Sequence, residues 1–349
     1  MENVIETNIK ESFSNRVLRD MTSGVLVINT SGQIIFCNKP AIKMLEIPKN
    51  YTENGSTFST LLSESNYNDE FFEFIIQSIY HKDEVHVGIC KFMAHSEKKY
   101  VFKMSSSYLI TEADETPQIV ITFTDETKAE ALKVKLKDSS ATFTTFLVGV
   151  CIWLIIFAIW LYNNKPFPKE YMTKGVEVLG IFIFIFIFAF TSLTFNDIGL
   201  KSNSLKKDLK VTFIIVFISF IVLGSLKFIL LKTNPGMLKA GTPFINFKRL
   251  NAHTLFYICR SLIQEFLARS GIQANIKRIT TSKYPAVTSI IVSSLIFAVL
   301  HIHLGLVFMA GAAILAGLLG ILYDKQDSII GVWIVHYFFG VFGTLFSFI

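Results

Sequence analysis

The sequence is short of cysteine and of charge, and both shortages narrow the class of protein. Its four cysteines among 349 residues show no C-x-x-C spacing, so we interpret them as small apolar fillers. Charged residues make up 17% of the chain, below the roughly 25% of an average soluble domain. No basic stripe with interleaved aromatic residues accompanies the net charge of +6, so we expect no nucleic-acid partner.

An apolar amino-terminal leader is also lacking, because residues 1–10 are polar. The first 140 residues have the composition of a soluble domain, whereas Phe, Ile, Leu and Val dominate the remainder and raise the mean hydropathy to +0.49. We therefore expect a cytoplasmic amino-terminal domain, followed by a multi-pass helical domain in the cell membrane.

The first 140 residues contain short apolar runs, bounded by turn residues, that predict β-strands. A turn at residues 29–32 joins the first two strands into a hairpin, and a helix at 41–47 follows the break at Pro40. The expected strands are residues 21–28, 33–37, 85–92, 100–108 and 119–124.

This order resembles a PAS domain over residues 12–127. The resemblance rests on the run 24–28, the turn glycine Gly32, the run 35–38 and the strand that ends at Thr127. It implies an α+β sensor domain whose ligand or signal the sequence leaves unknown. Three histidines are haem-ligand candidates only on paper, and we interpret them as surface residues: His81, His86 and His95.

A Lys/Glu/Ala/Leu-rich linker at residues 128–141 should be helical, because Ala129, Leu132 and Leu136 fall on one face. It serves either as a plain spacer or as a continuous helix that carries a rotation or a dimer contact into the membrane. Homodimerisation through the PAS-like domain and this linker is one expectation.

The remaining domain, residues 142–349, contains seven apolar segments and predicts an all-α bundle in contact with membrane lipid. The segments are residues 143–162, 176–195, 211–231, 254–272, 287–301, 304–323 and 329–349.

Segment 254–272 is unusual because it carries Arg260, Gln264, Glu265 and Arg269. Charged residues inside a membrane are costly and indicate a functional site by default. Glu265 and Arg269 are four residues apart and share one helix face, so they form either a purely structural ion pair or part of a site.

Two histidines on later segments favour a site. His301 and His336 lie in separate apolar helices, and with Glu265 they form a polar constellation inside the predicted bundle. His303 points away from His301, because two positions around a helix turn it by about 200°.

These residues resemble the CPBP family of intramembrane proteases, also called Abi or CAAX-protease-like, over about residues 250–340. The family motif E-E-x-x-x-R corresponds to residues 264–269, F-x-x-x-H to 297–301, and H-x-x-x-N to 336–340. A Gly-rich run at 316–323 is also similar to the family.

The resemblance implies that a motif-one Glu and His301 activate a water, while His336 helps to stabilise the oxyanion. We expect Glu265 to take over as the general base, oriented by Arg269, with His301 positioning the water. Gln264 replaces the family's catalytic Glu, and Gly340 replaces its Asn. We favour a metal-free site; zinc is an alternative that the ligand spacing does not favour.

The sequence therefore predicts an intramembrane endopeptidase that hydrolyses peptide bonds of a peptide or membrane-protein substrate, regulated by the PAS-like domain. The alternative is a catalytically inactive pseudoprotease that acts as a membrane sensor, receptor or scaffold. An inactive bundle would keep the substrate cavity and lose proteolysis through the changes at Gln264 and Gly340.

Overall fold

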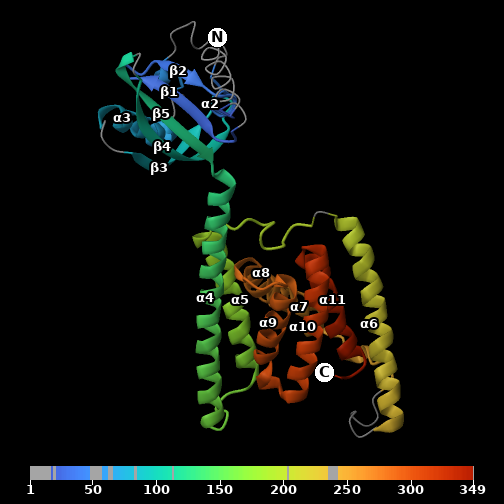
Figure 1. The fold of residues 1–349 in the computed structure, drawn as a ribbon. Helices are drawn as coiled ribbons and strands as arrows, with labels where there is room; N and C mark the ends of the chain where they lie inside the picture. The colour runs from blue at the N-terminus through green and yellow to red at the C-terminus, as the bar shows by residue number, and fades with distance from the viewer. Residues whose placement is uncertain are drawn as a thin grey trace. The chain divides into compact units, whose positions relative to one another are not determined.

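The computed structural model describes residues 17–18, 21–47, 57–61, 66–81, 85–111, 114–202, 204–234 and 243–348. Residues 12–16 of the expected sensor domain and Ile349 of the last expected helix lie outside this part of the chain. The chain forms two compact units, 1–133 and 134–349, and Figure 1 shows the elements of each.

The amino-terminal unit contains one antiparallel sheet with strand order β2-β1-β5-β4-β3. The five expected strands are confirmed, and the predicted hairpin pairs Val27 with Phe36. The strands are β1 Gly24–Asn29, β2 Ile34–Cys37, β3 His86–Met93, β4 Lys99–Thr111 and β5 Asp114–Asp125.

Short helices supply the other half of this unit's core. They are α2 Lys39–Leu45, η1 Phe58–Leu61, η2 Asn66–Asn68 and α3 Asp69–Tyr80. Phe71 and Ile75 on α3 are fully buried together with the central strand residues Phe102 and Ile121. The α+β prediction is therefore confirmed for this unit.

Buried Asn38 explains why β2 gives way to a helix. Its side-chain oxygen accepts hydrogen bonds from the amide of Val25 at 2.9 Å and from that of Ala41 at 3.0 Å. The second bond caps the amino terminus of α2, where Pro40 fits because that position needs no amide donor.

Helix α4, Thr127–Tyr162, combines the expected linker and the first expected membrane segment in one uninterrupted helix. The chain has no glycine or proline between residues 127 and 148, so nothing in the sequence breaks the helix at the polar-to-apolar change. The carboxylate of Asp125 accepts from the Thr127 amide at 3.0 Å, where β5 ends and α4 begins.

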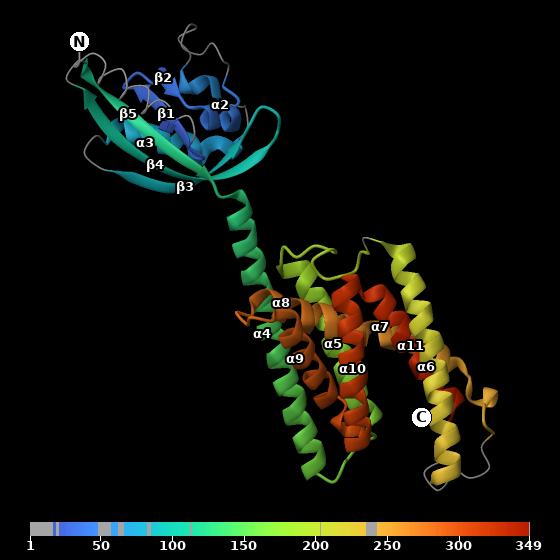
Figure 2. The ribbon, with the colours of Figure 1, turned by 45° about the vertical axis from the view of Figure 1, so that its right-hand side comes forward.

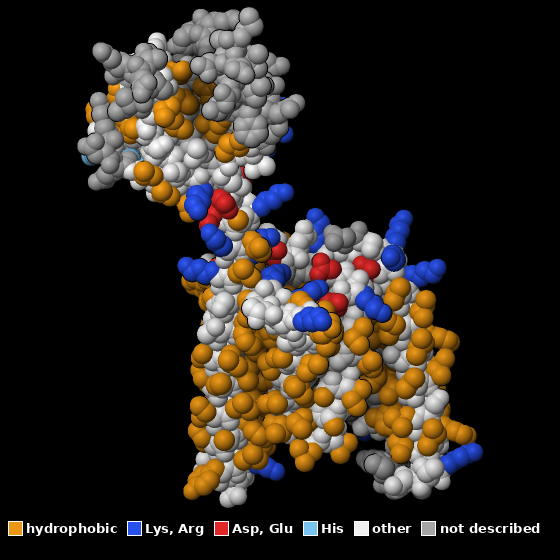
Figure 3. Space-filling model, in the orientation of Figure 1, with side chains coloured by type: hydrophobic (Ala, Val, Ile, Leu, Met, Phe, Trp, Pro, Cys, Tyr) orange, Lys and Arg blue, Asp and Glu red, His pale blue; other side chains and the backbone are white. Residues whose placement is uncertain are grey.

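Among the described residues, four helices are long and apolar enough to cross a membrane: α4, α5 Glu170–Phe190, α6 Leu205–Thr233 and α10 Leu306–Gln326. Two shorter apolar helices, α9 Pro285–Val299 and α11 Ile329–Leu345, pack with them (Figure 2). Hydrophobic side chains cover the flank of this unit in Figure 3. The chain is a multi-pass membrane protein.

The polar segment expected as a single helix over residues 254–272 has three parts. It begins as α7 Ala252–Glu265, widens into the π-helix η5 Phe266–Gln273, and ends as α8 Ala274–Ile279. All eight residues of η5 are buried. A π-helix holds its residues at an unusual spacing and is frequently found at functional sites.

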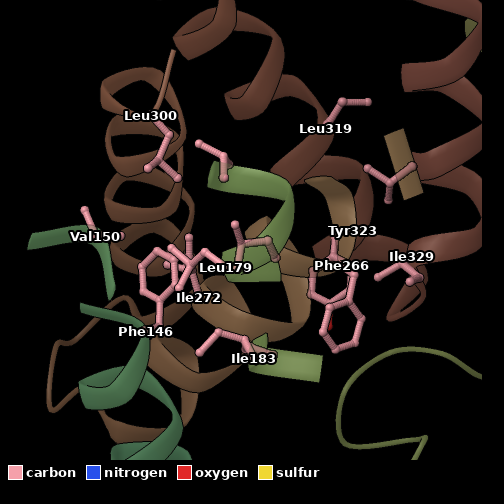
Figure 4. Close-up of a cluster of buried hydrophobic side chains, with 14 of the residues drawn as sticks. Phe146, Val150, Leu179, Ile183, Phe266, Ile272, Leu300, Leu319, Tyr323 and Ile329 are labelled. Atoms are coloured by element: carbon pink, nitrogen blue, oxygen red, sulfur yellow. The ribbon is translucent and has the colours of Figure 1, made fainter. Parts of the chain in front are cut away.

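Close packing places α5 against this segment. A Cβ atom on Gly180 of α5 would lie 2.6 Å from Cγ2 of Ile263, so the missing side chain allows this close contact between the two helices. Figure 4 shows Leu179 and Ile183 of α5 beside Ile272 of η5 in the same apolar cluster. The polar face of α7 and η5 is thereby turned toward α9, α10 and α11.

Candidate active site

Arg269 is the centre of a fully enclosed polar network. Its Nε donates to Glu265 Oε2 at 2.9 Å, its Nη1 to Gln273 Oε1 at 2.8 Å, and its Nη2 to the Ala316 carbonyl at 3.0 Å. Gln273 in turn donates to the Gly320 carbonyl at 2.9 Å. A Cβ at Gly320 would lie 3.0 Å from Arg269 Nη1, so this part of the Gly-rich run makes room for the guanidinium.

Glu265 joins this network to His336. Its second oxygen, Oε1, lies 2.7 Å from His336 Nδ1, and both side chains are buried. A carboxylate paired with an arginine only accepts hydrogen bonds, so the proton of this contact belongs to Nδ1. Nε2 of His336 is therefore the unprotonated nitrogen of the neutral ring.

His301 is fixed in the same tautomer by a different partner. Its Nδ1 lies 2.7 Å from the carbonyl oxygen of Phe297, which can only accept a hydrogen bond. The Phe297 ring lies 4.5 Å from the His301 ring and 6.1 Å from the His336 ring, centroid to centroid. The structure thus gathers both histidines around one aromatic residue, each with Nε2 as an acceptor.

His303 lies outside this group. Its Nε2 contacts Thr173 Oγ1 at 2.8 Å, and its ring meets the Trp153 ring at 5.8 Å. His303 is thus separated from His301 as expected, but not by α-helical geometry, because α9 ends at Val299 and His303 lies in the 3₁₀ helix Ile302–Leu304.

Gln264 is buried next to the network and forms no hydrogen bond with the residues that the structure describes. It precedes Ala268 by one turn, and Ala268 packs in an apolar cluster with Phe297. Arg260 lies apart, because its Nε contacts Glu177 Oε1 at 3.2 Å on the half-exposed side of α7.

Tyr257 is a residue that the sequence reasoning missed. Its ring lies 5.9 Å from the His336 ring in a T-shaped contact, and it occupies the space in front of Gly340. A Cβ atom at position 340 would overlap this ring, at 2.8 Å from its Cζ atom. The only signal in the sequence was the position of Tyr257, about two turns before Glu265 on the same helix.

A cavity of about 520 Å³ opens beside Tyr257 and Gly340, one turn of α11 beyond His336. Most of its lining residues are basic or polar by type, although the exposed lining surface is mainly apolar. Its lining residues are Lys248, Arg249, Asn251, His253, Thr254, Tyr257, Gly340 and Thr344.

Hydrogen bonds hold Glu265 on both sides. One oxygen accepts from Arg269, the other contacts His336, and the side chain is fully buried. Glu265 is therefore placed to orient His336, while its expected role as general base stays a prediction. The described residues contain no group of three or more His, Cys, Asp or Glu side chains arranged to hold a metal ion.

Two family models match the chain. Residues 248–342 match the family described as type II CAAX prenyl endopeptidase Rce1-like, and residues 18–131 match the PAS fold. The first match covers the whole polar network, Tyr257 and every residue of the cavity lining except Thr344. A comparison with curated proteins found no match.

Solved structures similar to this chain are PAS domains. A PAS domain of a two-component sensor histidine kinase is 11% identical, with a TM-score of 0.28, and the match covers 34% of this chain and 98% of that chain. The PAS domain of an HTR-like protein from Haloarcula marismortui is 11% identical, with a TM-score of 0.27 and coverages of 35% and 98%. That of Bordetella pertussis BvgS is 12% identical, with a TM-score of 0.27 and coverages of 33% and 85%.

Proposed function

We propose that this chain, which carries a PAS-fold domain and an Rce1-like CAAX-protease domain, is an intramembrane endopeptidase. The observation that carries the proposal is the contact between Glu265 and His336, buried inside a membrane bundle. A carboxylate that fixes the tautomer of an imidazole is a recurring means of making a general base.

In the proposed reaction, Nε2 of His336 takes a proton from water while the water oxygen attacks the peptide carbonyl carbon. Glu265 holds the Nδ1 proton and stabilises the imidazolium that forms. When the intermediate collapses, the C–N bond breaks and His336 returns the proton to the leaving amine. Arg269 keeps Glu265 ionised and in place.

His301 assists by accepting a hydrogen bond from the same water. Its Nδ1 is tied to the Phe297 carbonyl, so Nε2 is the nitrogen left to meet the water. Two acceptors around one water fix the direction of its lone pair, which lowers the entropic part of the barrier.

We assign the substrate to peptides or membrane proteins whose cleaved bond reaches the cavity beside Tyr257. The PAS-fold unit, as a soluble domain, lies on the cytoplasmic side of the cell membrane in this proposal. On the face shown in Figure 3, Lys and Arg side chains gather at the end of the bundle where α4 begins, which favours that orientation. Homodimerisation through the PAS-fold unit and α4 would supply the regulation.

The test uses the full chain in phosphatidylethanolamine and phosphatidylglycerol vesicles, with a library of internally quenched peptides as the probe. We expect cleavage by the native protein and loss of cleavage in His336→Ala. The matched control is His303→Ala, since this histidine is equally buried but lies outside the site. Equal cleavage by the native protein and His336→Ala, or no cleavage by the native protein, would overturn the proposal.

A second candidate is the inactive receptor, and Gln264 is the observation that favours it. A carboxamide cannot accept the proton that the corresponding Glu accepts in the related family. If the native chain is inactive and Gln264→Glu cleaves the library, the bundle is a pseudoprotease. Cleavage by the native chain contradicts this candidate.

A further inference from the structure

The site has an unmet chemical requirement. Attack on a peptide carbonyl places negative charge on its oxygen, and a donor aimed at that oxygen supplies a large part of the rate enhancement. His301 and His336 both keep their ring proton on Nδ1, where it is already used, so in the neutral state each offers only a lone pair to the substrate. A hydrogen-bond donor on another residue would meet this requirement.

Position 340 cannot supply the donor, because Gly340 has no side chain. The space that a side chain would fill is taken by the ring of Tyr257, which comes from α7. The Cζ atom, which bears the hydroxyl, would be 2.8 Å from a Cβ at 340. The phenol group of Tyr257 thus lies beside the space that the atoms beyond Cβ of a side chain at position 340 would occupy.

Tyr257 also borders the cavity that the proposed function assigns to the substrate. Tyr257 and Gly340 both line the cavity of about 520 Å³, and the Tyr257 ring packs edge-on against His336. A carbonyl attacked by a water on His336 would therefore have its oxygen within the region that the Tyr257 ring borders. No other tyrosine among the described residues lines this cavity.

We propose that Tyr257 is a catalytic residue whose hydroxyl donates a hydrogen bond to the oxyanion, in place of the side chain missing at Gly340. The inference rests on the proposed endopeptidase function. As water adds to the carbonyl carbon, the carbonyl π bond becomes a lone pair on oxygen, and the Tyr257 O–H donates to it without transferring its proton. The proton lost by the water stays on His336 until the amine leaves.

The first test removes only the hydroxyl. Tyr257→Phe keeps the ring that fills the space at Gly340, and we expect kcat on the quenched peptides to fall by about 10²- to 10³-fold with KM little changed. The matched control is Tyr337→Phe. The Tyr337 ring stacks on Tyr257 at 6.4 Å but does not line the cavity, so its hydroxyl should be dispensable.

The second test moves the donor back to α11. Gly340→Asn alone should fail to fold or lose activity, because its Cβ overlaps the Tyr257 ring. Tyr257→Ala alone should lose activity as Tyr257→Phe does. The double variant Tyr257→Ala with Gly340→Asn has room for the new amide. Its kcat should therefore be at least tenfold higher than that of Tyr257→Ala.

The outcomes separate this inference from the function itself. If Tyr257→Phe retains full kcat while His336→Ala is inactive, the endopeptidase stands and the role of Tyr257 is wrong. If His336→Ala cleaves as the native chain does, the proposed function is wrong. A thermal unfolding curve for each variant shows which losses come from misfolding.

Discussion

The ammonium of Lys135 on α4 lies 2.8 Å from the carboxylate of Asp197, which belongs to the connection between α5 and α6. The same connection holds the π-helix, because the Ser270 hydroxyl donates to the Ile198 carbonyl at 2.5 Å. Ser270 directly follows Arg269, the residue that anchors Glu265. A series of contacts therefore connects α4 with Arg269 and Glu265 through the segment between α5 and α6.

The Lys135–Asp197 pair predicts a pH-dependent stability. Partial burial raises the pKa of the Asp197 carboxyl, but hydrogen bonds from Lys135 and Thr194 outweigh it and lower the pKa to about 2, from an ordinary 3.8. The stabilisation is thus complete above the ordinary value and is lost as the pH falls toward 2. Asp197→Asn should lower the unfolding temperature by a constant amount at neutral pH, and by less as the pH falls below about 4.

Intrinsic tryptophan fluorescence of the detergent-solubilised chain during heating measures this difference. Glu130→Gln is the control, because Glu130 pairs with Lys133 at the exposed surface of α4 and such pairs contribute little. An Asp197→Asn effect that does not shrink in acid would contradict the assignment.

Glu265→Gln should keep the shape of the site and disable it. The carboxamide no longer stabilises the imidazolium of His336, so we expect kcat to fall roughly a thousandfold. It also leaves the buried Arg269 without its ionic partner. Removal of one member of a buried ion pair lowers the free energy of unfolding by about 3–5 kcal/mol. The variant's peptide cleavage and unfolding temperature are measured together.

Glu177→Gln is the matched control for that experiment, because Glu177 pairs with the half-exposed Arg260. It should retain cleavage. If Glu265→Gln has the native kcat while His336→Ala is inactive in the same assay, then His336 acts without a carboxylate partner.

Gly199→Ala should destabilise the bundle. Gly199 has a φ of +71°, and a Cβ there would lie 2.7 Å from the hydroxyl oxygen of Tyr323. The left-handed backbone alone costs about 1–2 kcal/mol for a non-glycine residue. Gly311→Ala on α10 is the control: a Cβ there meets nothing within 4 Å, and alanine favours a helix by about 1 kcal/mol. Unfolding temperatures should move in opposite directions.

The buried thiols of the PAS-fold unit should resist alkylation. Burial raises the pKa of Cys37 to about 12 and, with the nearby Glu70 and Glu73, that of Cys90 to about 11. At pH 8 the thiolate fraction of Cys37 is about one in ten thousand, so iodoacetamide should label it only after denaturation. Peptide mass spectrometry before and after denaturation makes the comparison, and equal labelling in both states would contradict it.

Local patterns in the sequence predicted the strands, the apolar helices and two relations within the site. The spacing of Glu265 and Arg269 predicted their pairing, and the assumption of an α-helix predicted the separation of His303 from His301, although the chain there is a 3₁₀ helix. Both predictions depend only on residues close together in the chain.

The remaining features of the site depend on contacts between distant segments, which no local pattern contains. The contact of Glu265 with His336 joins residues 71 positions apart, and it ties one carboxylate oxygen of Glu265 to the imidazole. The filling of the Gly340 space by Tyr257 likewise requires α7 and α11 to meet. The π-helix was missed because its residues are also compatible with an ordinary α-helix.

The π-helix also determines how this segment tolerates changes in length. Each residue of an α-helix turns the chain by about 100°, and the wider η5 holds one residue more than an α-helical turn would. Deleting one residue of η5 and restoring the tighter turn would therefore leave α8 in nearly its present orientation relative to Glu265, because the wide turn absorbs the extra residue. Bundles that differ from this one by a single residue between Glu265 and Asn275 can therefore present the same face of α8 to their neighbours.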